Sequence, residues 1–183
     1  MSEFDEYLRE QCNAILKLDE SAIKKSSDLI LKKSLNNNSI WIAGNGGSAT
    51  TAAHMATDLS KGVYTRIGTQ IRAICLNEFL GVQTAWANDE EFNTAIANSL
   101  KAFAKESDLV ILISGSGNST NILNAARMAQ ELNLKVISLT GMGGGKLASM
   151  SNISIVVDSF DMQTVENVHL VINHILYKTL AKM

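Results

Sequence analysis

Five short segments rich in β-branched residues alternate with segments of helical periodicity, and this alternation constrains the fold more than any other feature. We expect strands at 39–44, 70–76, 108–114, 135–140 and 153–158. We expect helices at 48–60, 88–104 and 119–132, a short helix after Gly145 and a final helix from Met162. Strands that alternate with helices indicate parallel β-α-β units. The sequence therefore predicts an α/β fold in which helices cover both faces of a central parallel sheet.

A helical segment precedes these units. Apolar residues recur at mostly helical spacing from Glu3 to about Lys33, which predicts one long or once-broken helix. The chain has 183 residues, no proline and no Gly/Ser-rich linker, so we expect a single domain over 1–183. The helical segment 1–35 is amphipathic, and we expect it to pack in a homo-oligomer.

The composition excludes several classes of protein. Charged residues make up 19% of the chain and the net charge is −2, so no basic surface for nucleic acid is expected. The acidic N-terminus lacks a signal region and no apolar run could span a membrane, so we expect a cytoplasmic protein. The two cysteines, Cys12 and Cys75, suggest neither a disulfide framework nor a cysteine zinc site.

The loop after the first expected strand has the composition of an anion site. It reads Gly44-Asn45-Gly46-Gly47-Ser48, and its glycines permit close approach of a ligand while Ser48 suits a helix N-cap. The amides of the following helix would face an anion. The loop matches neither a Walker motif nor G-x-G-x-x-G, so a nucleotide is disfavoured. A tight turn without a ligand is the alternative.

A second loop, "SGSGNSTN" at 114–121, gathers hydroxyl groups before another helix. Ser114, Ser116, Ser119 and Thr120 surround two glycines. Because neither loop contains lysine or arginine, an anion would be held by neutral donors and helix dipoles, which suits a sugar monophosphate better than ATP. A solvated turn is the alternative here.

Two expected helices each offer a carboxylate and an imidazole. His54 and Asp58 are four residues apart, and Glu166 and His174 are eight apart, so each pair shares a helix face. If the helices meet, these side chains could bind zinc or another divalent ion, or provide a general acid and a general base. Taken singly, each histidine favours a hydrogen-bonded structural role over metal binding or catalysis. His169 falls on a different face from His174, and we expect it to be structural.

These motifs together resemble a known family. The segments "AGNGGSATTAAHMATDL", "NDEEF", "ISGSGNSTN", "LTGMGGGKLA" and "VENVHLVINH" occur in the order and approximate spacing of the phosphoheptose isomerase family, within the sugar isomerase (SIS) fold. The resemblance implies an SIS-type three-layer αβα sandwich. It also implies aldose-ketose isomerisation of sedoheptulose 7-phosphate to D-glycero-D-manno-heptose 7-phosphate through an enediol, an early step toward bacterial surface heptose in lipopolysaccharide or capsule. The family implies a homotetramer with zinc as its metal.

The resemblance also implies roles for individual residues. The substrate would be lined by Asn45, Gly46 and Gly47, the phosphate held by Ser48, Ser114, Ser116 and Ser119, and the sugar contacted by Asn88 and Asp89. Gly115 and Glu166 are further substrate-binding positions. The metal-ligand positions are His54, Asp58, Glu166 and His174. Asp58 takes the place of the family's base, and His174 that of its acid.

Three positions depart from the family pattern. Asp58 stands where glutamate is usual, Glu166 where glutamine is usual, and Gly62 where arginine is common. The shorter aspartate calls for a shifted helix or a different sugar, since misplacement by ~1 Å can cost on the order of a hundredfold in rate. Two convergent carboxylates would repel, and a divalent cation would relieve that repulsion.

Two alternatives to a heptose isomerase follow. One is an SIS isomerase that acts on another sugar phosphate, which the departures at Asp58 and Glu166 would explain. The other is a non-catalytic SIS-fold regulator that binds the bacterial replication initiator. The retention of His54, His174 and both carboxylates argues against the second alternative.

Overall fold

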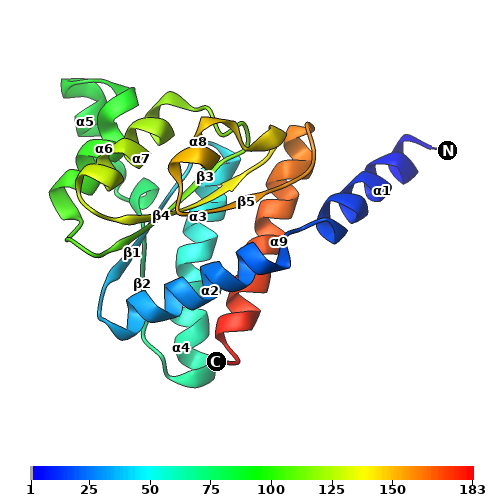
Figure 1. The fold of residues 1–183 in the computed structure, drawn as a ribbon. Helices are drawn as coiled ribbons and strands as arrows, with labels where there is room; N and C mark the ends of the chain where they lie inside the picture. The colour runs from blue at the N-terminus through cyan, green and yellow to red at the C-terminus, as the bar shows by residue number, and fades with distance from the viewer. Residues whose placement is uncertain (1) are drawn as a thin grey trace.

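The computed structural model describes residues 2–183, and these form one five-stranded sheet (Figure 1). The strands stand in the order β2 (Arg72–Cys75), β1 (Ser39–Ala43), β3 (Leu109–Ser114), β4 (Lys135–Thr140) and β5 (Ile153–Val156). Every neighbouring pair is parallel. The expected strands are all present, with ends that differ by no more than two residues, and the predicted α/β fold with a central parallel sheet is confirmed.

Helices surround the sheet. They are α1 (Glu3–Leu16), α2 (Glu20–Leu35), α3 (Gly47–Thr57), α4 (Val63–Ile67), α5 (Leu80–Asp89), α6 (Phe92–Phe103), α7 (Thr120–Glu131), α8 (Gly145–Met150) and α9 (Met162–Leu180). Within residues 2–183, none of them combines the length and apolar character needed to cross a bilayer.

The sheet separates two hydrophobic cores because successive strand residues point to opposite faces. In β1, Ile40 and Ile42 join the core that α2, α3 and α9 cover, whereas Trp41 and Ala43 join the core that α6, α7 and α8 cover. Figure 1 shows the two groups of helices on opposite sides of the strands. The molecule is therefore the three-layer αβα sandwich that the sequence predicts.

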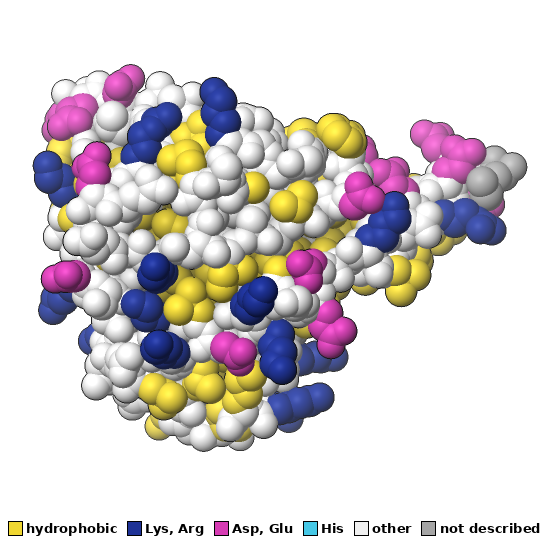
Figure 2. Space-filling model, in the orientation of Figure 1, with side chains coloured by type: hydrophobic (Ala, Val, Ile, Leu, Met, Phe, Trp, Pro, Cys, Tyr) yellow, Lys and Arg dark blue, Asp and Glu magenta, His cyan; other side chains and the backbone are white. Residues whose placement is uncertain are grey.

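The N-terminal helix is broken once, which is one of the two forms expected. The chain leaves α1 at Lys17, and Asp19 caps α2 by accepting a hydrogen bond from the Ala22 backbone amide at 3.1 Å. Helix α1 contacts α9 and then projects away from the sandwich (Figure 1). Its hydrophobic side chains lie at the surface among charged ones (Figure 2).

The expected helix at 88–104 is wrong in its N-terminal part. Two helices occupy this region, because Glu90 has non-helical dihedral angles, φ −126° and ψ −97°, and ends α5. Asn88 and Asp89 therefore lie in the last turn of α5 instead of opening a helix. Helix α5 has no clear signal in the sequence, because none of its side chains is fully buried and its apolar residues are not periodic.

The helix after β1 is longer than the expected 48–60. It runs from α3 through a π-helical turn, η1 (Asp58–Gly62), into α4, and ends at Gly68 with φ +74°. The π turn begins at Asp58, whose carbonyl accepts a hydrogen bond from the Val63 amide, five residues on. Single π turns of this kind are often found at functional sites.

Candidate functional site

The carboxyl ends of β1 and β3 lie side by side and place two glycine loops together. Strand β1 has β2 on one side and β3 on the other, so the strand order reverses there. In open parallel sheets ligands bind beyond the carboxyl ends of the strands at such a point. The loops predicted as anion sites therefore adjoin each other at the edge where a ligand is expected.

The first loop is shaped by close backbone packing. Gly46 has φ +50° and precedes the first turn of α3, where no side chain caps the helix. A Cβ at Gly44 would lie 2.6 Å from the Ser48 backbone, so the loop folds back on its own helix. The Ser48 side chain is buried at this turn. The loop thus presents uncapped backbone amides of α3 at the carboxyl edge of the sheet.

One asparagine pair and one further asparagine fix this loop to its neighbours. Asn45 and Asn121 exchange two side-chain hydrogen bonds, at 2.8 and 2.7 Å. The Asn77 side chain accepts from the Gly44 amide at 3.1 Å and donates to the Gly44 carbonyl at 2.9 Å. The loops after β1, β2 and β3 therefore form one hydrogen-bonded unit.

The serine loop, residues 114–121, is held in place by the segment that follows β4. The Ser114 and Ser119 hydroxyls lie 3.3 Å apart, and Ser119 precedes α7 without capping it through its side chain. Gly117, with φ +62°, accepts a hydrogen bond from the Leu147 amide at 2.9 Å. The glycine-rich segment 140–149 thus braces the serine loop.

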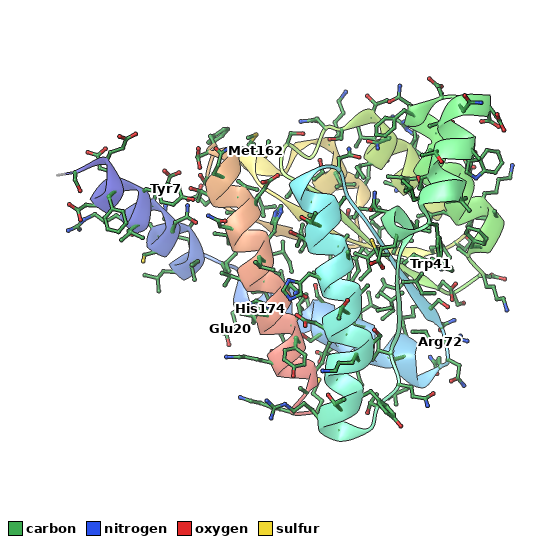
Figure 3. All side chains as sticks on the ribbon, turned by 180° about the vertical axis from the view of Figure 1, so that it is seen from behind. Tyr7, Glu20, Trp41, Arg72, Met162 and His174 are labelled. Carbon is green, nitrogen blue, oxygen red and sulfur yellow. The ribbon has the colours of Figure 1, made fainter. Side chains whose placement is uncertain are left out.

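The paired histidine and carboxylate helices do meet. Helices α3 and α9 run side by side, and His174 points from α9 toward α3 (Figure 3). The Asp58 Oδ2 atom lies 3.4 Å from His54 Nε2 and 3.8 Å from His174 Nε2. The two imidazoles contact edge to face, with ring centroids 5.1 Å apart. Three of the four predicted metal ligands are therefore brought together.

The geometry of these three residues suits a divalent metal. One donor atom from each of His54, Asp58 and His174 lies within 4.8 Å of the other two. Tetrahedral zinc ligands stand about 2.0–2.2 Å from the metal and hence about 3.3 Å from one another. The distances from Asp58 to the two imidazoles are close to that spacing, and all three side chains are partly exposed. The donor set fits zinc with a coordination position left for another group.

The fourth predicted ligand lies elsewhere in this structure. The Glu166 carboxylate packs against Gly47 at the start of α3, where an added Cβ would lie 2.6 Å from its oxygen. It is outside the three-residue group. Its role as a metal ligand stays a prediction, but its position places a carboxylate beside the uncapped amides of α3.

Two further predicted contacts lie on α5. Asn88 donates a side-chain hydrogen bond to Asp89 at 2.9 Å, and both residues are exposed. Helix α5 and the asparagine pair line a cavity of about 240 Å³ that also contacts Phe92 and Ile96. The contact of Asn88 and Asp89 with the sugar remains a prediction.

His169 is fully buried, in keeping with the structural role expected for it. Burial lowers its pKa from 6.5 to about 4, and the Thr140 backbone opposes this weakly. Among the described residues, neither ring nitrogen has a partner that meets full hydrogen-bond geometry. His169 is therefore a core residue whose ring is uncharged at neutral pH.

Three site residues escaped sequence reasoning. Asn77 follows the carboxyl end of β2, a position that could have been inspected as the other strand ends were. Asn121 lies within the serine loop but its pairing with Asn45 has no sequence signal. Asn173 precedes His174 and donates to Asp58 at 2.9 Å, a contact that depends on how α9 rotates against α3.

Comparisons with known proteins agree with this geometry. A family model described as "SIS domain" matches residues 3–141. The phosphoheptose isomerase of Helicobacter pylori (strain ATCC 700392 / 26695) is 37% identical over 157 residues, which are 86% of this chain and 81% of that protein. That of Thermodesulfovibrio yellowstonii is 36% identical over 156 residues, 85% of this chain and 77% of that protein.

Solved structures of similar proteins have the same fold over their whole length. Phosphoheptose isomerase GmhA from Neisseria gonorrhoeae superimposes with a TM-score of 0.89 and 28% identity, covering 98% of this chain and 95% of that one. A phosphoheptose isomerase from Francisella tularensis superimposes with a TM-score of 0.91 and 28% identity, and each chain is covered completely.

Proposed function

This chain belongs to the SIS domain family and, within it, to the phosphoheptose isomerases, and from this we propose that it converts sedoheptulose 7-phosphate to D-glycero-D-manno-heptose 7-phosphate. It is a sugar phosphate isomerase of heptose biosynthesis. The observation that carries the proposed reaction is the convergence of His54, Asp58 and His174, the first two on the helical segment that follows the loop after β1 and the third on α9. One part of this site can move protons, and the other can hold a phosphate.

The phosphate would lie against the serine loop. Ser114, Ser116 and Ser119 offer hydroxyl groups before the N-terminus of α7, Gly115 lies in the same loop, and Ser48 lies in the first turn of α3. Neutral donors and the helix dipole suffice for a monophosphate. The sugar would then extend past Asn45, Gly46 and Gly47 toward the histidines, with Asn88, Asp89 and Glu166 as further contacts.

Isomerisation requires one proton to be removed from C1 of the ketose and one to be delivered to C2. We assign the first step to Asp58, which as a carboxylate can act as a general base, and assign proton transfer at the carbonyl oxygen to His174. The product of the first step is an enediol. His174 contacts Asp58 from a different helix, so the two groups can approach a bound sugar from separate directions.

We propose that His54, Asp58 and His174 bind a divalent metal, with Glu166 as a fourth ligand. Zinc is the metal that the nitrogen and oxygen donors and the family resemblance favour. When bound, such an ion would stabilise negative charge on the sugar oxygens as a Lewis acid. The group also favours an enzyme over the non-catalytic regulator, since a scaffold has no need of it.

The surface of α1 supports a homo-oligomer. Phe4, Tyr7, Leu8 and Leu16 of α1 are exposed, and Leu16 is 84% exposed. A projecting helix with these apolar residues would be covered in a tetramer or a dimer, with residues 1–35 in the interface and 1–183 as one SIS domain. We propose the tetramer, with heptose for lipopolysaccharide or capsule as the pathway.

A panel of substrates tests the proposed reaction. The purified protein is incubated with sedoheptulose 7-phosphate and, separately, with pentulose and hexulose phosphates, and aldose formation is followed by NMR. We expect conversion of the heptulose phosphate with the highest kcat/KM. Preference for a shorter ketose phosphate would support the alternative substrate that the shorter Asp58 side chain suggests.

A further inference from the structure

The Asp58 carboxylate lies between the two imidazoles of the candidate site, but few hydrogen bonds hold it in place. Its distances to the two imidazoles, 3.4 and 3.8 Å, are longer than a charge-assisted hydrogen bond of about 2.7–2.9 Å. Within residues 2–183, one hydrogen bond to this carboxylate meets full geometry. It comes from Asn173, whose Nδ2 donates to Asp58 Oδ2 at 2.9 Å.

Asn173 lies on α9 immediately before His174 and is fully buried. Its orientation follows from chemistry: a carboxylate only accepts hydrogen bonds, so the amide nitrogen must face Asp58. The Asn173 Oδ1 atom then points into the protein, where it has no partner among the described residues. The side chain thus makes one hydrogen bond at the expense of leaving a buried acceptor unsatisfied.

This arrangement is unfavourable for stability alone. A buried acceptor without a hydrogen bond destabilises a fold, and an apolar side chain of similar shape, such as leucine, would avoid that loss. The neighbouring positions Ile172 and Leu176 of α9 are apolar and belong to the core. The feature that leucine could not provide is the donor directed at Asp58.

We propose that Asn173 is a positioning residue that holds the Asp58 carboxylate toward His54 and His174, so that the three side chains present one set of donors to a divalent cation. The inference rests on the metal role in the proposed function. Asp58 begins the π turn with helical backbone angles, φ −63° and ψ −43°, and a helical backbone leaves its side chain more than one rotamer. Asn173 supplies the missing restraint from the facing helix.

Hydrogen-bonding partners of metal-ligating carboxylates commonly matter for affinity, and their loss typically costs about 10- to 100-fold in metal binding. The test is Co²⁺ binding to the full chain, with the dissociation constant measured by competition with a chelating indicator and the coordination geometry from the visible d–d spectrum. Asn173→Leu removes the donor and keeps the number and branching of the side-chain heavy atoms. Asn173→Ala serves if the leucine variant does not fold, as judged by circular dichroism and thermal melting.

The matched control is Thr164→Val. Thr164 is also fully buried on α9, but its hydroxyl accepts from Gln11 at 2.6 Å, away from Asp58. We expect Asn173→Leu to weaken Co²⁺ binding at least tenfold and alter the d–d spectrum, while Thr164→Val leaves both unchanged. A merely structural role for Asn173 would lower the melting temperature without altering the spectrum.

Two results would overturn the inference, and they differ. Wild-type protein that binds Co²⁺ beside an Asn173→Leu variant with the same affinity and spectrum would overturn the positioning role alone. Wild-type protein that binds no Co²⁺ would contradict the metal role in the proposed function and this inference with it.

Discussion

At the scale of single residues, the site and its surroundings contain histidines that differ in their exposure to solvent. His54, Asp58 and His174 keep partial exposure, so each can exchange protons or accept a metal. His169, on the same helix as His174, is buried and uncharged. One helix therefore carries a partly exposed histidine, the proposed acid, on one face and a core histidine on another.

The buried His169 predicts acid sensitivity. Its pKa is about 4 in the folded protein and about 6.5 when unfolded, so below pH 6.5 the unfolded chain binds a proton that the folded one does not. The free energy of unfolding is therefore highest, as far as this ring is concerned, above pH 6.5, and it decreases as the pH falls from 6.5 toward 4. Between pH 7 and 5 we expect the unfolding free energy of the wild type to fall by about 2 kcal/mol more than that of His169→Leu.

Urea unfolding at the two pH values measures this difference. Equal pH dependence of the wild type and His169→Leu would show that the ring is hydrated or paired in solution. The comparison with the variant removes the contribution of other titrating groups, which both proteins share.

A second prediction concerns Glu166 and the affinity of the site for a divalent metal. If its carboxylate moves from Gly47 to complete the ligand set, Glu166→Gln replaces an anionic ligand by a neutral amide and weakens divalent metal binding by about tenfold or more. Competition with a chelator measures the affinity, and Glu131→Gln on the surface of α7 is the control. Unchanged affinity in Glu166→Gln would exclude Glu166 from the ligand set.

At the scale of elements, the site depends on how closely α3 folds back on β1. Gly44 allows that approach, because any Cβ there would overlap the Ser48 backbone. The Asn77 side chain then locks the Gly44 peptide from the loop after β2. The α3 amides that we propose to face the phosphate are thus positioned by backbone packing, and polar side chains support them.

This packing predicts that Gly44→Ala is destabilising, by about 1–3 kcal/mol in unfolding free energy, because the added methyl group forces α3 away from β1. Gly81→Ala is the matched control: an added Cβ meets nothing within 4 Å, and alanine favours helix α5. Thermal and urea unfolding compare the two. A Gly44→Ala protein as stable as Gly81→Ala would contradict the close approach of helix and strand.

At the scale of the whole molecule, the order of strands and helices could be read from the sequence because buried parallel strands are β-branched and continuous. Both glycine loops and the His54–Asp58 pair could be placed for the same reason, since strand ends and helix spacing fix them. Helix α5 and the π turn at Asp58 could not. Exposed α5 has no apolar periodicity, and the π turn depends on tertiary packing against α9.

Contacts between segments distant in the sequence could not be predicted either. The Asn173–Asp58 hydrogen bond joins residues 115 apart in sequence, and its formation depends on the rotation of α9 about its axis. The position of Glu166 beside Gly47 depends on the same rotation. Helical spacing gives the faces of two helices but not the depth at which their side chains meet.

The projecting α1 predicts self-association of the whole chain. Phe4, Tyr7 and Leu8 are 69%, 41% and 46% exposed, and burying them between subunits would be favourable. We expect light scattering coupled to size exclusion to show a tetramer for the wild type and smaller species for Phe4→Ser/Leu8→Ser. A wild-type monomer would contradict this account of α1.

The proposed function makes one claim above all: Asp58 and its two histidines perform a metal-assisted isomerisation of a heptulose phosphate. The most direct test is an NMR time course of sedoheptulose 7-phosphate with the enzyme in deuterated water, with and without a chelator, beside Asp58→Asn and the surface control Asp28→Asn. We predict an aldoheptose phosphate that carries deuterium at C2, formed by the wild type and Asp28→Asn. Chelation should abolish it, and Asp58→Asn should slow it by about 10²–10⁴-fold. Full conversion by Asp58→Asn, or neither conversion nor exchange by the wild type, would contradict the claim.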